Sequence, residues 1–265
     1  MIYIIGGNGF VGSAYVRLAQ ERGHSFRVIT RNNYGEFAGT SCDILINANG
    51  NSKKFLAGRE PLNEFDMSVR SIAESLDAFS CERYIYLSTG DVYCDQSAPT
   101  VTDETQAIDP AGQSRYGLHK FVAEMLVRGT RKRWLIMRMG GFVGPGMRKN
   151  AVFDMLTGAP VRLSPASQLQ FISTDTAAAL VWRLIDAGIE REIVNLGGKG
   201  TVSLASLHSQ IGSSSRFEHE APTVRYELSL EKLKHLTGGS IPSSENEMQT
   251  FLSSGAAKRI AADHG

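Results

Sequence analysis

The chain has 265 residues and a nearly balanced charge, with 28 Lys and Arg against 27 Asp and Glu and a net charge of +1. This length allows one large domain or a domain with a small lobe, and the balanced charge predicts neither nucleic acid nor a membrane surface as a partner. The cysteines (Cys42, Cys81 and Cys94) lack metal-ligand spacing and are typical of free thiols in a reducing compartment. No apolar run reaches the roughly 20 residues that span a bilayer, and a first strand from Ile2 leaves no room for a signal peptide. We therefore expect a cytoplasmic protein without a metal centre.

Short apolar runs alternate with longer amphipathic stretches along the chain. Strands are expected at 2–5, 26–30, 43–47, 84–88, 134–138 and 193–196, and helices at 10–22, 66–79, 114–129 and 174–187. This alternation predicts an α/β protein with a Rossmann-like, doubly wound parallel sheet. We expect this domain to comprise 1–145 and roughly 173–198, a small C-terminal lobe to comprise 146–172 and 199–255, and 256–265 to be a disordered tail.

Glycines follow the first expected strand directly. Gly6, Gly9 and Gly12 are spaced G-x-x-G-x-x-G, with Phe10 and Val11 at the start of the next helix. Strand, glycine turn and helix are the context of a dinucleotide-binding motif, in which backbone N–H groups and the helix dipole hold a pyrophosphate. The alternative is a tight turn packed for its own sake.

The end of the second strand indicates which dinucleotide is bound. An Asp or Glu there favours NAD because it binds the ribose hydroxyls. Here the strand ends in Thr30 and Arg31, and the planar fork of Arg31 suits a 2′-phosphate. The sequence therefore favours NADP(H) over NAD(H), unless Arg31 is only a solvated surface charge.

A tyrosine and a lysine lie four residues apart in the segment SRYGLHK. On a helix Tyr116 and Lys120 share a face, and a nearby ammonium lowers the pKa of a phenol from about 10. Such a pair transfers protons near neutral pH. Thr89 ends the expected strand 84–88 at the edge where parallel sheets bind ligands, so its hydroxyl is a candidate to hold a substrate oxygen.

With these motifs in order, the chain resembles the extended short-chain dehydrogenase/reductase superfamily, in its NAD(P)-dependent epimerase/dehydratase branch. The likeness covers nearly the whole chain. It is carried by GGNGFVG, by YIYLSTGDVY (family SS-x-x-VYG), SRYGLHKFVAE (YG-x-SK-x-x-x-E), RMGGFVGPG (R-x-x-x-VYGPG), FISTDTAAAL (FIHVDDVA-x-A), VNLGG (YNLGG) and LEKLKHLTGGSIPSS (SK-x-x-x-LGW-x-P).

The resemblance implies roles for individual residues. Tyr116 becomes the catalytic acid or base, Lys120 lowers its pKa and holds the nicotinamide ribose, and Thr89 binds the substrate oxygen. Asn47 and Ala48, in the segment 47–50, take the place of a cofactor contact. Phe142 and Val143, in the segment 140–143, are expected near the nicotinamide.

The chain departs from the family in three places. Residues 32–42 form a short connection between two expected strands, where the family has a helix, a strand and a further helix. The family residues that flank the adenine therefore have no obvious match in this chain. Thr89-Gly90-Asp91 replaces the Thr-Asp-Glu of sugar 4,6-dehydratases, and because glycine cannot donate a proton, elimination is disfavoured. Cys94 stands where the family usually has glycine.

Candidates for substrate binding are chosen by position. Asn49, Asn51, Ser52 and Lys53 follow a strand at the expected mouth of the site, where they touch a sugar or form an ordinary polar loop. The resemblance suggests that basic residues of the lobe hold a diphosphate, and the candidates, each also readable as a surface charge, are Arg148, Lys149, Arg162 and Arg225.

These observations favour an NADP-dependent oxidoreductase that reduces a keto group on a nucleotide-linked sugar. The alternatives are a nucleotide-sugar 4-epimerase with a tightly held cofactor and a non-catalytic NADP(H)-binding sensor or scaffold. The resemblance also implies a homodimer formed through the Tyr–Lys helix, whose apolar stripe comprises Leu118, Phe121, Val122, Met125 and Leu126; alternatively, the stripe covers the sheet.

Overall fold

The computed structural model describes residues 1–51 and 53–264, and the chain divides into two compact units. The first unit comprises Met1–Cys94, Glu104–Met139 and Ala178–Asn195, and the second comprises Asp95–Asp103, Gly140–Ala177 and the described residues from Leu196 on. These boundaries differ from the expected ones at 95–103 and 140–145. The reason is local hydrogen bonding: the Glu227 amide donates to the Gln96 carbonyl at 2.9 Å, and the Gly140 amide to the Leu196 carbonyl at 2.9 Å.

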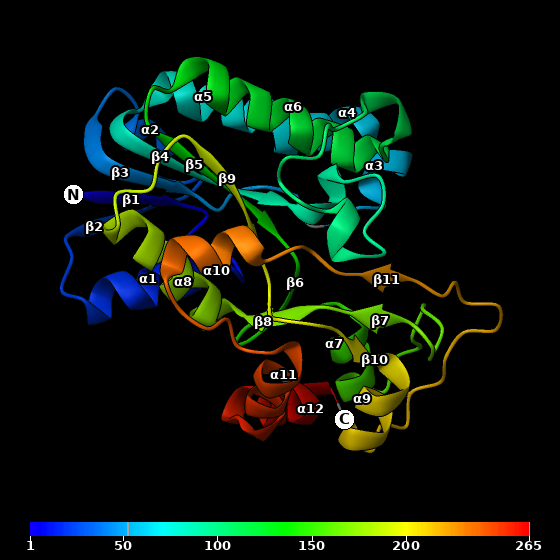
Figure 1. The fold of residues 1–265 in the computed structure, drawn as a ribbon. Coiled ribbons are helices and arrows are strands. Elements are labelled where there is room, and N and C mark those ends of the chain that lie inside the picture. The colour runs from blue at the N-terminus through cyan, green and yellow to red at the C-terminus, as the bar shows by residue number, and fades with distance from the viewer. Residues whose placement is uncertain (52, 265) are drawn as a thin grey trace. The chain divides into compact units, whose positions relative to one another are not determined.

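A six-stranded parallel sheet forms the centre of the first unit, as the alternation of strands and helices predicted (Figure 1). Its strand order is β2-β1-β3-β4-β5-β9, so β2 lies at one edge. The strands are β1 (Ile2–Ile5), β2 (Phe26–Ile29), β3 (Ser41–Asn47), β4 (Ser80–Thr89), β5 (Trp134–Met139) and β9 (Glu192–Leu196). Because these strands run parallel, their carboxyl ends share one edge of the sheet.

Helices cover both faces of this sheet, with α5 and α6 on one side and α1 and α8 on the other (Figure 1). The helices are α1 (Gly12–Glu21), α2 (Tyr34–Phe37), α3 (Leu56–Arg59), α4 (Pro61–Phe65), the π-helix η1 (Asp66–Arg70), α5 (Ser71–Ala78), the 3₁₀ turns η2 (Gly90–Val92) and η4 (Pro110–Gly112), α6 (Arg115–Thr130) and α8 (Thr174–Asp186), which begins in the second unit. The expected connection of 32–42 is realised as the single turn α2.

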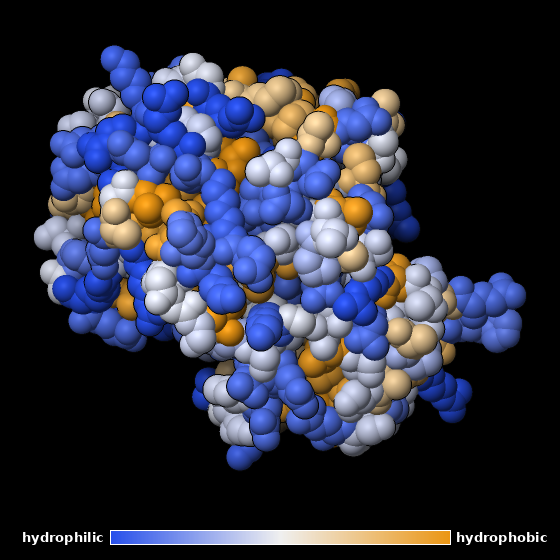
Figure 2. Space-filling view, viewed as in Figure 1, coloured by the Kyte–Doolittle hydropathy of each residue, from blue (hydrophilic) through white to orange (hydrophobic). Residues whose placement is uncertain are grey.

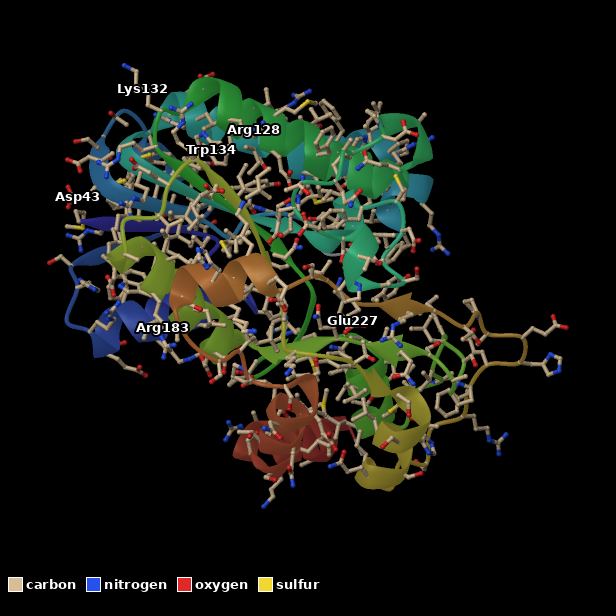
Figure 3. All side chains as sticks on the ribbon, in the orientation of Figure 1. Asp43, Arg128, Lys132, Trp134, Arg183 and Glu227 are labelled. Carbon is tan, nitrogen blue, oxygen red and sulfur yellow. The ribbon has the colours of Figure 1, made fainter. Side chains whose placement is uncertain are left out.

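One apolar core lies between the sheet and the α5–α6 layer. Strand residues such as Tyr84 and Ile136 pack there against Ile72 of α5 and Val127 of α6, and these side chains are almost fully buried. Burial of each large apolar side chain contributes about 1.5–3 kcal/mol. At the far end of α6 the Arg128 guanidinium lies 5.9 Å from the centre of the Trp134 ring (Figure 3), which ties the helix to the start of β5.

The second unit contains two small sheets. Strands β6 (Gly141–Val143) and β8 (Phe171–Ser173) pair in parallel, and β7 (Gln168–Leu169) lies between β10 (Val202–Ser203) and β11 (Arg225–Tyr226). Its other elements are η3 (Pro99–Val101), α7 (Ala151–Thr157), α9 (Leu204–Ile211), α10 (Glu231–Thr237), α11 (Ser244–Ser253) and α12 (Gly255–His264).

Helix α12 corrects one expectation. Residues 256–264 were expected to be disordered, but they are helical, and Gly265 lies outside the described residues. Ala256, Ala257 and Ile260 are buried, and α12 contacts α7 and α11. Small apolar residues at helical spacing give this short segment a face to pack. Across the part of the chain that the structure describes, no helix combines the length and apolar character needed to cross a membrane.

Candidate active site

The glycine turn lies where three strands end. The Gly6 amide donates to the Ile29 carbonyl at 3.1 Å, and the Ala48 amide donates to the Ile5 carbonyl at 3.0 Å, so the turn is fixed to β2 and β3. Gly6 has φ +76°, and a Cβ on Gly12 would lie 2.3 Å from the Gly6 carbonyl oxygen. Both positions therefore require glycine.

The start of α1 suits an anionic group. The helix begins at Gly12, its N-cap Val11 offers no side-chain hydrogen bond, and no acidic residue lies in its first turn. Phe10 and Val11 are half-buried beside it, while Gly9 is exposed. The amides of Ser13 and Ala14 already donate to the Gly9 and Val11 carbonyls, at 2.9 and 3.2 Å. The positive end of the helix dipole, with no acidic side chain in the first turn, fits the pyrophosphate of a dinucleotide.

The turn after β2 holds Arg31 at the surface. The Thr30 amide and hydroxyl both donate to Asn33 Oδ1, at 2.7 and 3.1 Å, and Asn33 Nδ2 donates to the Val28 carbonyl at 3.0 Å. Arg31 is exposed within this turn. No carboxylate occurs from Thr30 to Gly35, so the usual partner of the NAD ribose is missing.

Asn47 has a different position from the one expected. Its side chain is completely buried and donates to Tyr84 Oη at 2.7 Å and Ser75 Oγ at 3.1 Å, while its Oδ1 accepts from the Asn49 amide at 3.0 Å. The Asn47 side chain therefore shapes the loop that follows β3 from inside the core. The Ala48 carbonyl oxygen lies 3.0 Å from the position of a Cβ on Gly6, so the backbone of this loop lies against the glycine turn.

Tyr116 is positioned by the first turn of α6. Ser114 caps the helix by accepting from the Gly117 amide at 3.1 Å. A Cβ on Gly117 would lie 2.1 Å from the Asp91 carbonyl oxygen, so glycine lets the helix lie directly against η2. Tyr116 is buried there, and its hydroxyl donates to the Asn51 carbonyl at 2.9 Å.

Thr89 ends β4 on the other side of this contact. Its hydroxyl donates to Asp91 Oδ2 at 2.8 Å and accepts from the Asp91 amide at 3.2 Å. Lys54 Nζ in turn contacts Asp91 Oδ1 at 2.6 Å. Asp91 thus orients the threonine hydroxyl, and its carboxylate is neutralised by a lysine.

Lys120 lies one turn after Tyr116 and is buried. Its ammonium lies 4.6 Å from the centre of the Tyr86 ring and donates to the Leu87 carbonyl at 3.4 Å. Burial lowers its pKa to about 8, although the carboxylates of Glu124, Glu64 and Asp91 act in the opposite direction. The aromatic face compensates part of the lost hydration of the cation.

The pKa of Tyr116 is raised, which is opposite to the direction expected from the Tyr–Lys spacing. Burial is the largest cause, and the carboxylates of Asp91 and Glu64 add to it. Spacing alone gives no measure of burial, which disfavours the charged phenolate. Burial at this place therefore favours the neutral phenol of Tyr116 over its phenolate.

A buried charge pair and a buried carboxylate–imidazole contact near this site had no role in the sequence-based prediction. Glu124 and Arg138 form a pair of fully buried side chains, with Arg138 Nη2 donating to Glu124 Oε2 at 2.8 Å and Ser88 Oγ to Glu124 Oε1 at 2.6 Å. Glu124 ends the motif SRYGLHKFVAE and Arg138 begins the motif RMGGFVGPG, so the sequence did mark both residues. The carboxylate–imidazole contact joins Glu64 and His119, and no motif marks Glu64.

The loop after β3 contributes backbone more than side chains. Asn51 folds back on itself, with Oδ1 accepting from the Lys53 amide at 2.7 Å and Nδ2 donating to the Lys53 carbonyl at 2.9 Å. Asn49 is half-buried and Lys53 is exposed. Ser52 lies outside the described residues.

The remaining candidates belong to the second unit. Phe142 and Val143 lie in β6, and Arg148 and Lys149 are exposed in the turn that follows. Two other arginines are already engaged within that unit: Arg225 Nη2 contacts Glu227 Oε2 at 2.5 Å, and Arg162 Nε contacts Glu218 Oε1 at 3.5 Å. Among the described residues no group of His, Cys, Asp and Glu is arranged to hold a metal ion.

Comparison with known sequences now decides the family. Residues 2–197 match the sequence model of the NAD dependent epimerase/dehydratase family. The chain belongs to this family. No curated protein matches it significantly. Membership makes it an enzyme of the epimerase/dehydratase type that uses a nicotinamide dinucleotide, in agreement with the glycine turn and the uncapped start of α1.

Solved structures that superpose on this chain include two UDP-sugar 4-epimerases and RMD, which was solved with NADPH. A UDP-galactose 4-epimerase superposes with a TM-score of 0.79 at 19% identity, covering 99% of each chain. RMD from Pseudomonas aeruginosa, complexed with NADPH, gives 0.75 at 18% identity, covering 96% of this epimerase/dehydratase-family chain and 99% of RMD. UDP-glucuronic acid 4-epimerase from Bacillus cereus, solved with NAD, superposes with a TM-score of 0.79 at 16% identity. The match covers 98% of this chain and 99% of that epimerase. At such identities the likeness establishes the fold.

Proposed function

We propose that this chain is an NADP(H)-dependent oxidoreductase that reduces a keto group on a nucleotide-linked sugar. The observation that carries the proposal is the placement of a buried Tyr116 beside the Thr89 end of β4, in the unit that contains the glycine turn. A protonated phenol is the form that donates a proton, as reduction of a carbonyl requires.

The chain's own residues divide the work as follows. A bound reduced nicotinamide supplies a hydride to the carbonyl carbon. Thr89 donates a hydrogen bond to the carbonyl oxygen, and Tyr116 Oη gives that oxygen its proton, so the ketone becomes an alcohol. Both hydroxyls must then exchange their present partners, Asp91 and the Asn51 carbonyl, for the substrate oxygen. Lys120 supplies positive charge beside the phenolate that is left.

The choice of NADP(H) rests on the turn after β2. Arg31 is exposed there, and the first carboxylate after the strand is Glu36 of α2. The position that carries an acid in NAD-binding proteins therefore has a cation, which suits a 2′-phosphate. A structural neighbour complexed with NADPH and another with NAD show that the fold accepts both.

A nucleotide-linked sugar is the substrate class that the neighbours support. One of them, MoeE5, was solved with UDP-glucose and NAD, and it superposes with a TM-score of 0.80 at 16% identity. Elimination is disfavoured, because Gly90 follows Thr89 and Asp91 is already paired with Lys54. The names of several neighbours favour 4-epimerisation as the second candidate, which uses the same Thr89, Tyr116 and Lys120.

The test is to mix the purified protein with NADPH and a panel of nucleotide-linked 4-keto-6-deoxy sugars, and to follow the absorbance of the reduced nicotinamide. We expect consumption with at least one sugar. Tyr116→Phe should lower kcat by roughly 100-fold or more, the scale of lost acid catalysis, and still bind NADPH. The matched control is Tyr3→Phe, whose hydroxyl contacts Thr40 at 3.0 Å near the opposite edge of the sheet.

The other outcomes separate the alternatives. NADPH binding without consumption, together with interconversion of UDP-sugars that differ only at C4, would establish an epimerase. Binding with neither reaction would favour a sensor. Full turnover by Tyr116→Phe would refute the proposed role of the phenol in either enzyme.

A further inference from the structure

Lys120 is a buried cation with little hydrogen bonding of its own. It is 4% exposed, and among the described residues its Nζ donates only to the Leu87 carbonyl, at the long distance of 3.4 Å. An ammonium has three protons to donate, so removing it from water without partners is costly. Burial accordingly lowers its pKa to about 8. Another group must therefore stabilise the cation in this place.

The carboxylates that face Lys120 are each bonded to another side chain. They lie on α6, in η2 and on α4, and the pairs are Glu124 with Arg138 at 2.8 Å, Asp91 with Lys54 at 2.6 Å, and Glu64 with His119. Within the part of the chain that the structure describes, none of the three forms an ion pair with Lys120. The other titratable neighbours are the buried phenols of Tyr116, one turn earlier on α6, and Tyr86 on β4.

The ring of Tyr86 lies against the ammonium. Lys120 Nζ lies over this ring, 4.6 Å from its centre, and Tyr86 has no exposed surface. The face of an aromatic ring carries negative partial charge and attracts a cation within about 6 Å, most strongly where water is excluded. Both groups are buried here, so the contact belongs to the strong kind. The ring face is thus the main stabilising partner of the cation.

Strand β4 fixes the place of this ring. Tyr86 pairs in register with Asn47 of β3 and Ile136 of β5, so the strand is held on both sides. Side chains alternate along a strand, and Tyr84 shares the face of Tyr86. The Tyr84 ring lies under a different cation, Arg131, whose guanidinium is 5.8 Å from the ring centre. The strand that ends at Thr89 therefore also carries the seat of the catalytic lysine.

The hydroxyl of Tyr86 has no part in this contact. Its Oη is buried and has no hydrogen-bond partner among the described residues, which is unfavourable for a polar group. Burial raises the pKa of this phenol, so the ring remains uncharged. The aromatic face is therefore the property of Tyr86 that serves Lys120, and phenylalanine would supply it equally well.

We propose that Tyr86 is a positioning residue for Lys120: the face of its ring holds the ammonium in the buried place from which it supports the phenolate left on Tyr116 after proton transfer. Tyr86 is fully buried and acts only through Lys120. The inference deepens the proposed reductase function and rests on it. Without the ring the ammonium would keep the long bond to the Leu87 carbonyl alone, and burial would favour the neutral amine.

The test measures the protonation of Lys120 in the free protein. Protein labelled with ¹³C-lysine is titrated by NMR, and the Cε signal of Lys120 is assigned by its loss in Lys120→Met. The wild type should titrate near pH 8. Tyr86→Leu removes the aromatic face and keeps an apolar side chain, so the midpoint should fall by about 1–1.5 pH units, the effect of a cation–π contact away from water.

Matched variants separate the ring face from packing. Tyr86→Phe keeps the ring and should keep the wild-type midpoint. Phenylalanine with one, two or three ring fluorines at the same position retains the shape of the ring and weakens its negative face, so the midpoint should fall stepwise along this series. Tyr84→Leu makes the same truncation two residues earlier, under Arg131, and should leave the Lys120 midpoint unchanged.

The reductase assay supplies a second measurement. A lysine with a lowered pKa is charged only below its new midpoint, so the kcat of Tyr86→Leu, relative to the wild type, should be reduced at pH 8 and recover as the pH is lowered toward 6. Tyr86→Phe should retain the kcat of the wild type at both pH values. A loss in Tyr86→Leu that does not change with pH would contradict an action through the charge of Lys120.

A Lys120 midpoint that stays in place along the fluorine series would overturn the proposal, and this series decides even if Tyr86→Leu does not fold. The titration needs neither cofactor nor substrate. If no sugar of the panel is reduced, the reductase fails while the contact between ring and lysine is still judged by the midpoint. Active enzyme with an unmoved midpoint overturns only the role of Tyr86.

Discussion

Arg31 is the residue on which cofactor choice depends. It is exposed in the turn that Asn33 closes, and no carboxylate lies beside it from Thr30 to Gly35. We expect Arg31→Ser to weaken NADPH binding by about tenfold or more, since a hydrogen bond to a charged group contributes about 1.5–3 kcal/mol, and to leave NADH binding nearly unchanged. Fluorescence titration of both nucleotides measures this.

The control for that experiment is Arg27→Ser. Arg27 is an exposed arginine on the same edge strand, β2, and its removal tests the general effect of losing one positive charge. Equal losses in the two variants would indicate long-range attraction only, and an unchanged NADPH affinity in Arg31→Ser would contradict recognition of a 2′-phosphate.

At the scale of residues the sequence marks candidate residues but does not show which side chains surround them. Tyr116 and Lys120 are recognisable because helical spacing and a nearby strand end are local features. The role of Asn47 was not predictable, since its partners Ser75 and Tyr84 come together only in the folded core. The Glu64–His119 contact joins residues 55 positions apart, which no local pattern can reveal.

Helix α6 offers a direct comparison of two glycines. Gly117 has no room for a side chain, because a Cβ would lie 2.1 Å from the Asp91 carbonyl, whereas Gly129 has nothing within 4 Å. Gly129→Ala should raise the free energy of unfolding by about 0.5–1 kcal/mol. Gly117→Ala should lower it by roughly 1–3 kcal/mol, the range for overpacking, and shift Tyr116 away from Thr89.

Urea unfolding of both variants checks this prediction, with NADPH binding as a second measurement. Similar stabilities for Gly117→Ala and Gly129→Ala would mean that α6 does not lie as close to η2 as the structure indicates. The comparison is sharp because both residues belong to one helix and receive the same methyl group.

At the scale of elements the apolar pattern predicted the six strands of the parallel sheet and helices α1, α5, α6 and α8, and it did not predict the helices and short strands of the second unit. It predicted one helix over 66–79, where the structure has a π-helical turn, Asp66–Arg70, before α5. One π-helical turn adds a single residue to the helix and scarcely changes the spacing of its apolar residues. The sequence pattern therefore does not predict it. The expected disordered tail was wrong because α12 packs on α7 and α11, which composition alone does not show.

Apolar side chains on the α4–α6 side of the first unit predict that the molecule forms a homodimer. Met125 of α6 is 46% exposed, and Leu62 and Phe65 of α4 are 80% and 38% exposed; Figure 2 shows apolar surface atoms over these helices. Leu126 instead packs against the core, so the expected stripe is divided between core and surface. A second copy would remove the exposed part from water.

Light scattering with size-exclusion chromatography tests the dimer. Met125→Glu should convert a dimer into a monomer, because an interface buries a charge poorly. Val101→Glu, at a residue 38% exposed in the second unit, should leave the mass unchanged. A wild-type monomer at micromolar concentration would contradict the prediction.

The order of the strands has a consequence for synthesis of the chain on the ribosome. The sheet closes with β9 beside β5, and the segment Ala178–Asn195 returns to the first unit only after Gly140–Ala177 of the second unit has been made. A nascent chain that ends before Glu192 therefore leaves the edge of β5 unpaired, with Leu135, Ile136 and Met137 lacking their last neighbour. Such an edge can pair with other chains, so this protein passes through an interval of its biosynthesis in which a chaperone has a defined strand to cover.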